Sequence, residues 1–328
     1  MMHFVQLLDQ GQWSTIPVQL KKENELLSVQ HYQKAIWVEM LNPTDIERAF
    51  ILQQANIDLP EHHELHQIEF SNQFYRENAG IFLTLNLVTI VYPLPEIHAV
   101  NIIVAQNKIF TVRYSDPNPI ELFLEKLVPR PTEIKNHYQL LGALLQSFIG
   151  KNADNLELAG ERTNFLSLIL SSGLSNHSLK NREGRLNETL KEINVLEGLI
   201  SMVYQSVSSL EMLVNYLEQN IDSKLLDLKG IKRDIFSLLK QADYLNQKVV
   251  FQLDSTLGLI NIEQMGIVKI FTVLAMVFMP PTLIASIYGM NFKHMPELQS
   301  AIAYPIVLGA IALSAYFPWM IFRRKGWI

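Results

Sequence analysis

The spacing of hydrophobic residues changes near position 130 of this chain of 328 residues. Before that point, short runs rich in β-branched and aromatic residues are separated by turn residues, a pattern typical of strands. The runs are residues 35–41, 66–78, 80–91, 99–108 and 109–115. Pro43, Thr44 and Asp45 provide good chemistry for a helix start. We therefore expect residues 1–130 to form an α+β cytoplasmic domain, a mixed sheet with helices packed on it.

Helical periodicity begins at about residue 131. Apolar residues recur every three or four positions over residues 133–172 and 182–220, with a break near 173–181. We interpret residues 131–223 as a cytoplasmic region of long helices.

A third helix is predicted next. No proline interrupts residues 224–279, so a stalk helix over 224–268 is expected to continue into the segment that follows it. At ~1.5 Å per residue, roughly 65 helical residues make a rod on the order of 95 Å long.

The stalk carries a heptad seam, which is apolar early and polar later. Its members are Leu228, Ile231, Ile235, Leu238, Ala242, Leu245, Val249, Gln252, Thr256, Leu259 and Glu263. We infer a homo-oligomer whose stalks surround a central axis, because the polar members suit a wet axis. Asp254, one helical position off the seam, would also face that axis. An antiparallel coiled pair within one subunit would give the same pattern.

Two later runs, residues 270–290 and 299–322, contain no charged residue. Each exceeds 20 residues, about the length that a helix needs to cross a hydrocarbon core of ~30 Å. They predict a two-helix transmembrane hairpin, with the first helix over 269–290, an external loop over 291–300 and the second helix over 301–322.

Positive charges orient this hairpin, because short flanks rich in Lys and Arg stay on the cytoplasmic side. Arg323, Arg324 and Lys325 follow the second run in the basic tail 323–328, and Lys269 precedes the first run. Aromatic interface anchors lie at Trp319 and Trp327. The N-terminus shows no signal-peptide pattern. We expect a multi-pass protein of the cell inner (plasma) membrane with both termini in the cytoplasm.

Composition narrows the classes of function. The net charge of −5 gives no electrostatic footprint for nucleic acid. The chain has no cysteine, which excludes disulfides and thiolate metal sites. No nucleotide loop, nucleophile elbow or pair of catalytic carboxylates is present, so we expect neither an enzyme nor a cofactor.

One stripe of the first membrane helix carries small, weakly polar or soft side chains at helical spacing. They are Val268, Thr272, Ala275, Met279, Thr282 and Ser286. The helix has no carboxylate or His to replace the water shell of a divalent ion, so such an ion would pass largely hydrated. Helix–helix packing favours small residues equally well. Pro280 and Pro281 predict a kink in this helix.

Polar residues are concentrated in the short gap between the two membrane segments. Gly289 allows a close backbone approach, and Asn291 supplies an amide oxygen and donors. In an oligomer these residues would form rings that hydrogen-bond the waters of a hydrated cation. Gly-Asn is also an ordinary turn signal.

A histidine cluster lies in the N-terminal domain. His62, His63 and His66 stand among Glu61 and Glu64, and two of the histidines are four residues apart. That spacing fits Zn²⁺ or Co²⁺ on one helix face. A solvated surface is the simpler interpretation.

The sequence between the membrane segments resembles the signature of the CorA family of magnesium transport proteins. The matching residues are Tyr288-Gly289-Met290-Asn291-Phe292 and Met295-Pro296-Glu297-Leu298. Further similarity covers LGLINIEQ, the segment IVKIFTVLAMVFMPPTLIAS, the basic tail with Trp327 and, more loosely, IWVEMLNPT and IFTVRYS.

This resemblance implies a funnel-shaped homo-pentamer that carries Mg²⁺, and also Co²⁺ or Ni²⁺, across the inner membrane. It implies an ion-selectivity mouth at Gly289, Met290 and Asn291, and adds Phe271 to the pore-lining stripe as a hydrophobic constriction with Val268. It implies an acidic cytoplasmic entrance at Asp254 and a basic ring of Arg323, Arg324 and Lys325. Family members close when intracellular Mg²⁺ occupies acidic sites, for which Asp227 and Asp234 are candidates here.

Two departures from the family pattern affect the expected ion preference. Met265 stands where relatives often have Asn, and Lys293, beside His294, stands where many have an acidic residue. A cation at the mouth disfavours divalent entry, and Glu297 in the external loop offsets it in part. A zinc transporter of the related branch, or a non-conducting membrane-tethered scaffold, therefore remains an alternative to a magnesium channel.

Overall fold

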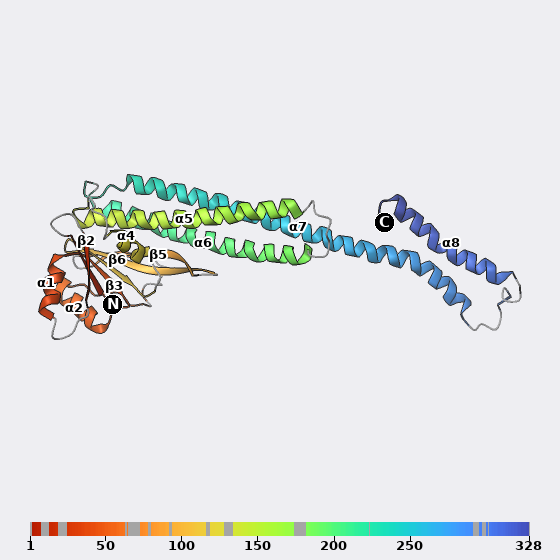
Figure 1. The fold of residues 1–328 in the computed structure, drawn as a ribbon, viewed down its shortest axis with the longest axis horizontal. Coiled ribbons are helices and arrows are strands. Elements are labelled where there is room, and N and C mark those ends of the chain that lie inside the picture. Colours follow the sequence, from red (N-terminus) through yellow and green to blue (C-terminus); the bar gives the residue numbers. More distant parts are fainter. Residues whose placement is uncertain are drawn as a thin grey trace. The chain divides into compact units, whose positions relative to one another are not determined.

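A computed structural model describes most of the chain. The described residues are 2–7, 13–18, 25–62, 64, 73–77, 80–91, 94–115, 119–127, 134–173, 182–222, 224–290, 295–296, 300 and 302–327. The chain divides into two compact units (Figure 1). The first unit joins residues 1–179 with 187–253, and the second joins residues 180–186 with 254–328.

The first unit begins with seven strands and the helices that cover them. The strands are β1 (Met2–Leu7), β2 (Trp13–Val18), β3 (Ala35–Leu41), β4 (Phe74–Glu77), β5 (Gly80–Val91), β6 (Leu94–Ala105) and β7 (Lys108–Arg113). The short helices are α1 (Glu25–Lys34), α2 (Asp45–Ala55) and α4 (Pro119–Leu127). Three long helices follow, α5 (His137–Gly173), α6 (Arg182–Asn220) and α7 (Lys229–Tyr288), of which α7 continues into the second unit. The last helix, α8 (Ala303–Arg324), belongs to the second unit.

The strands form one mixed sheet in the order β2-β1-β3-β7-β6-β5-β4. β3 and β7 are parallel, and every other neighbouring pair is antiparallel. The predicted mixed sheet is therefore confirmed. β6 begins at Leu94, earlier than the predicted start at residue 99, because it pairs with β5 along the whole length of a long hairpin.

The predicted start of α2 is confirmed by its capping. The Thr44 hydroxyl accepts a hydrogen bond from the Glu47 backbone N–H, and the Glu47 carboxylate accepts one from the Thr44 N–H. This capping box satisfies two of the donors that a helix leaves open at its first turn. Asn56 ends the helix in the left-handed conformation, with φ of 55°.

The two faces of the sheet belong to two cores, because side chains alternate across a strand. Leu83, Leu85 and Ile102 pack into the core that contains residues of α4, α5, α6 and the first part of α7. Phe82 and Ile103, their neighbours in the sequence, pack into the core with residues of α1 and α2.

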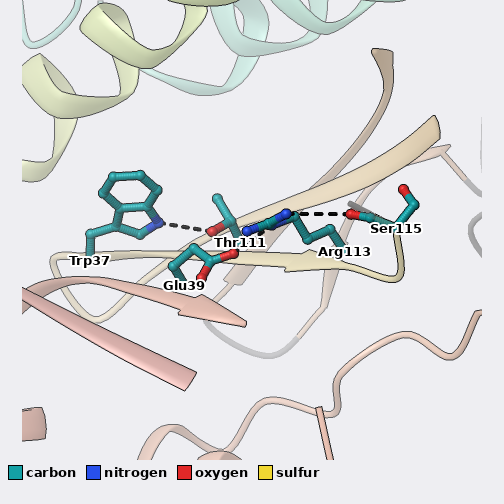
Figure 2. A network of polar contacts seen from close by, with 5 residues as sticks. All are labelled: Trp37, Glu39, Thr111, Arg113 and Ser115. Atoms are coloured by element: carbon teal, nitrogen blue, oxygen red, sulfur yellow. Dashed lines mark hydrogen bonds and ion pairs between the residues drawn. The ribbon is translucent and has the colours of Figure 1, made fainter. Parts of the chain in front are cut away.

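A buried ion pair links the parallel strands β3 and β7. Arg113 Nε donates to Glu39 Oε1 at 2.7 Å, with side chains 4% and 1% exposed (Figure 2). Beside it, Trp37 Nε1 donates to Thr111 Oγ1 at 2.9 Å. Removing one partner of such a pair costs about 3–5 kcal/mol, because the other charge stays buried.

The edge of β5 beyond its pairing with β4 is covered by side chains of the long helices. Asn86 N–H donates to Ser209 Oγ at 3.2 Å, and Ser206 Oγ donates to the Asn86 carbonyl at 2.6 Å. Asn155 Nδ2 lies 3.5 Å from the Val88 carbonyl. These side chains of α5 and α6 contact backbone N–H and C=O groups of β5 that could otherwise pair with another strand.

The first part of the heptad seam on α7 packs inside the subunit, so the inference that it faces other copies is wrong. Leu228, Ile231, Ile235, Ala242, Leu245 and Val249 are buried in the core with residues of α5 and α6. Gln252 Nε2 donates to the Thr163 carbonyl at 2.7 Å and to Ser167 Oγ at 2.6 Å. These polar contacts explain the polar seam position without a wet axis.

The alternative of an antiparallel pair within one subunit holds for α6, whose end lies beside the start of α7, where Lys232 Nζ contacts Glu218 Oε2, but it does not hold for α5. Contacts between α5 and α7 advance in the same direction along both helices: Gly160 lies near Leu245, and Asn164 contacts Lys248. α5 is therefore parallel to α7 in this unit. A Cβ at position 160 would meet Leu245 Cδ2 at 3.7 Å, an ordinary van der Waals distance, so this contact does not require a glycine.

Candidate ion pathway

Among the described residues, two helices are long and apolar enough to cross a membrane, judged by length and composition. They are the apolar part of α7 and the whole of α8. α7 is assigned as one helix from Lys229 to Tyr288, which confirms that the stalk continues into the first apolar segment. The assignment also passes through Pro280 and Pro281 without a break.

The predicted stripe lies exposed on α7. Val268, Phe271 and Met279 are 64–67% exposed, and Thr272, Ala275, Thr282 and Ser286 are exposed too. Among residues 265–288, all of which are described, Val273 alone is buried. A single chain therefore leaves this segment without protein packing on almost every side.

The two threonines of the stripe have the same hydrogen bond. Thr272 Oγ1 donates to the Val268 carbonyl at 2.8 Å, and Thr282 Oγ1 donates to the Phe278 carbonyl at 2.7 Å. Because each hydroxyl proton is held by its own helix, the oxygen lone pairs are left to accept. Water molecules around a cation point their protons outward, so these oxygens suit a hydrated ion.

The helix ends at Tyr288, the first of the signature residues. Gly289 N–H donates to the Ala285 carbonyl at 2.9 Å, and Met290 N–H to the Ile287 carbonyl at 3.3 Å. A Cβ at position 289 would lie 3.2 Å from the Ala285 carbonyl oxygen. That distance is tight, so a side chain at this position would require a small shift of the backbone. Met290 is exposed. Asn291, Lys293, His294 and Glu297 lie outside the described residues.

The predicted cytoplasmic entrance shares a side of α7 with the stripe. Asn261 and Val268 follow Asp254 by seven and fourteen residues, and a helix drifts by only ~20° per heptad. Asp254 is exposed, as is Met265.

The basic tail continues directly from α8. Arg323 Cζ lies 5.2 Å from the centre of the Trp319 ring, and Arg324 and Lys325 are exposed. The chain then turns at Gly326, which has φ of 67°. Sequence analysis missed the role of this glycine, although a glycine just past a helix end is a known stop signal.

The two acidic candidates for regulation are exposed and have local contacts. Asp227 Oδ1 accepts from the Lys229 N–H at 3.0 Å at the start of α7. Asp234 Oδ1 lies 3.6 Å from Arg233 Nε. Within the described part of this single chain, no group of three or more His, Cys, Asp or Glu side chains is placed to hold a metal.

The structure places only part of the histidine cluster. The His62 ring lies 5.1 Å from the Tyr114 ring, edge to face, and Glu64 Oε2 accepts from the Glu61 N–H at 2.8 Å. His63 and His66 lie outside the described residues.

Comparison with known proteins identifies the family. The family model described as "CorA-like Mg2+ transporter protein" matches residues 32–324. The magnesium transport protein CorA of Campylobacter jejuni (strain RM1221) is 31% identical over 314 residues, which covers 90% of this chain and 92% of that protein. The protein of the same name from Escherichia coli (strain K12) is 30% identical over 298 residues, with the same coverage.

Solved structures show the same fold. The CorA magnesium transporter from Methanocaldococcus jannaschii superposes with a TM-score of 0.74 at 17% identity, covering 100% of this chain and 99% of that one. The full-length CmaX protein gives a TM-score of 0.66 at 11% identity, covering 99% and 97%. The chain belongs to the family of CorA-like Mg²⁺ transporter proteins.

Proposed function

We propose that this chain forms a homo-pentameric divalent-cation channel of the inner membrane, which carries Mg²⁺, and also Co²⁺ and Ni²⁺, into the cell. The hydrated ion binds first at the mouth formed by Gly289, Met290 and Asn291. It then passes along the stripe of α7 to the entrance at Asp254. Both termini, and the basic ring of Arg323, Arg324 and Lys325, are in the cytoplasm.

The observation that carries this proposal is the chemistry of the stripe. Its hydroxyls at Thr272 and Thr282 are held as acceptors, and no charged residue lies between 270 and 290. Such a surface hydrogen-bonds the waters of a hydrated ion without removing them. Mg²⁺ sheds its water reluctantly, so it fits this surface better than a cage of carboxylates.

The driving force comes from the membrane potential. A potential of 100 mV, negative inside, stabilises a cation inside by ~2.3 kcal/mol per charge, so a divalent ion gains about twice that. No chemical step is needed for influx.

A second surface of α7 supports assembly of several copies. Phe236, Tyr244 and Phe251 are 57–71% exposed and lie eight and seven residues apart, on the side opposite the buried seam. Exposed aromatic side chains seven or eight residues apart on one side of a helix favour packing against another helix. We infer that other copies of the chain cover this face, and the family resemblance implies five.

This assembly is tested by Phe251→Asp, which places a charge on this exposed face. The full-length variant in detergent should give smaller particles than the wild type by light scattering. Phe165→Asp, at an exposed position of α5, is the matched control and should leave the assembly intact. Equal masses for all three proteins would remove this face from the interface.

The mouth is tested by Mg²⁺ influx into proteoliposomes that contain a Mg²⁺-sensitive dye. Asn291→Ala should abolish influx without changing the oligomer, whereas Asn246→Ala, at an exposed stalk position, should transport like the wild type. Normal influx through Asn291→Ala would refute the mouth. A wild-type protein that carries Zn²⁺ rather than Mg²⁺ would support the zinc alternative, and no flux of either ion would support the scaffold.

Closure by intracellular Mg²⁺ belongs to the same proposal. Asp227→Asn keeps the oxygen that caps α7 and removes only the charge, and Asp234→Asn loses an exposed ion pair. We expect either change to raise the internal Mg²⁺ concentration that halves influx. Unchanged inhibition in both variants would place the regulatory sites elsewhere.

A further inference from the structure

The end of α8 is closed by a turn with two defined hydrogen bonds. Gly326 N–H donates to the Arg323 carbonyl at 3.2 Å, and Trp327 N–H donates to the Phe322 carbonyl at 3.0 Å. Gly326 is in the left-handed region, with φ of 67°. This is the Schellman arrangement of a helix C-terminus, and it favours glycine because a Cβ is strained at that dihedral.

The turn brings Trp327 back against the helix that it ends. The Trp327 and Phe322 rings stack with centroids 5.4 Å apart, the apolar contact that often accompanies such a turn. Trp327 is thereby held both by its backbone hydrogen bond to Phe322 and by the contact between the two rings.

Lys269 of α7 reaches this turn within the same compact unit. Its Nζ lies 5.5 Å from the centre of the Trp327 ring and 3.4 Å from the Gly326 carbonyl oxygen. The ring face attracts the ammonium, and the carbonyl oxygen accepts a hydrogen bond from it. One side chain therefore joins the start of the apolar part of α7 to the end of α8.

The position of Lys269 gives this contact a consequence for ions. It follows Val268 of the stripe directly, and it is the only charged residue between Glu263 and Lys293. A helix turns by ~100° per residue, so the contact with α8 holds the ammonium off the side that carries Val268 and Thr272. A long lysine stem released from the turn can swing toward that side, where its charge repels a divalent cation.

We propose that Gly326 and Trp327 are positioning residues of the ion pathway, which hold the Lys269 ammonium against the end of α8 and away from the stripe. This assignment rests on the proposed function for its effect on transport. The contact between Lys269 and Trp327 does not depend on the proposed function, so the contact and its effect on transport are measured separately.

The contact is tested without transport, by labelling lysines of the detergent-solubilised full chain with an amine-reactive reagent. Trp327→Leu should raise labelling of Lys269 roughly two- to fivefold relative to Lys325, the shift that corresponds to losing a cation–π contact at an exposed site. Trp319→Leu, which removes a ring that faces Arg323, is the matched control and should leave Lys269 labelling unchanged. Equal labelling in wild type and Trp327→Leu would overturn the proposal.

The effect on transport is tested by rescue. Trp327→Leu should lower Mg²⁺ influx into proteoliposomes roughly two- to fivefold at saturating Mg²⁺. The double variant Trp327→Leu/Lys269→Met should recover influx, because the released charge is gone. A tryptophan that only supports folding would leave the double variant as impaired as the single one, and that result would also overturn the proposal.

The two failures are distinguishable. If wild-type proteoliposomes take up no Mg²⁺, the proposed function fails, and the labelling ratio still decides whether the contact exists. If wild type transports and the double variant is not rescued, the positioning role fails while the channel stands.

Discussion

The two parts of α7 use the same helix in opposite ways. From Leu228 to Gln252 one side is buried against α5 and α6, and the opposite side exposes aromatic residues. From Met265 to Tyr288 most side chains are exposed within one chain and Val273 alone is buried, although the residues are more apolar. The first part is thus stabilised by its own subunit, whereas the second has few packing partners among the described residues of the chain.

Shortening one apolar side chain in each part of α7 should affect stability very differently. Leu245→Ala should lower the free energy of unfolding by about 2–5 kcal/mol, because Leu245 is fully packed against α5. Leu274→Ala, in the exposed part, should change it by less than about 0.5 kcal/mol in detergent. Urea unfolding of the solubilised proteins gives both values, and equal losses would contradict the division of α7.

The polar end of the buried seam is tested next. Gln252→Ala removes two hydrogen bonds to α5 and should cost about 1–3 kcal/mol. Gln247→Ala, at an exposed position one and a half turns earlier, should be nearly neutral. If both substitutions proved neutral by urea unfolding, the buried contact between α5 and α7 would have no part in stability.

A smaller effect is expected from a hydroxyl of the stripe. Thr282→Val keeps the shape and removes the oxygen, so Mg²⁺ influx should fall roughly twofold to tenfold, as for the loss of one hydrogen bond. Ser314→Ala on α8 is the matched control, because the Ser314 hydroxyl also donates a hydrogen bond within its own helix, to the Ile311 carbonyl at 2.8 Å. Equal influx in Thr282→Val and wild type would argue for packing as the role of the stripe.

The smallest effect belongs to the exposed ion pair on the stalk. Asp234→Asn should change the free energy of unfolding by about 0–1 kcal/mol, since Arg233 and Asp234 are solvated. By contrast, Glu39→Gln should cost about 3–5 kcal/mol, because it leaves Arg113 buried without its partner charge. Thermal unfolding of the two variants side by side measures this difference.

Much of the fold was predictable because its signals are local. The strand over residues 35–41 has the predicted bounds, and the start of α2 follows from the Thr44 and Glu47 pair. The resemblance to the CorA family is confirmed, and membership in a family of transporters confirms that the chain is not an enzyme. These conclusions depend on residues close together in the chain or on a distinctive short motif.

Other features could not be predicted because they depend on distant partners. A heptad pattern shows which side of α7 is buried, but not whether its own subunit or another copy covers it. Likewise, Asn86 meets Ser206 and Ser209 more than a hundred residues later, and no local pattern pairs them. For the candidate site, the spacing predicts the stripe and the family motif implies the mouth, and both stay predictions, whereas the contact between Lys269 and Trp327 needed the structure.

The most direct test of the central claim asks which side of α7 ions pass. Because the natural chain has no cysteine, Met279→Cys and Val277→Cys each add a single thiol, on and off the stripe. In proteoliposomes, a charged water-soluble thiol reagent should block Mg²⁺ influx through Met279→Cys and leave influx through Val277→Cys unchanged. Block at position 277 with none at 279, or no block at either in a conducting protein, would contradict the proposed pathway.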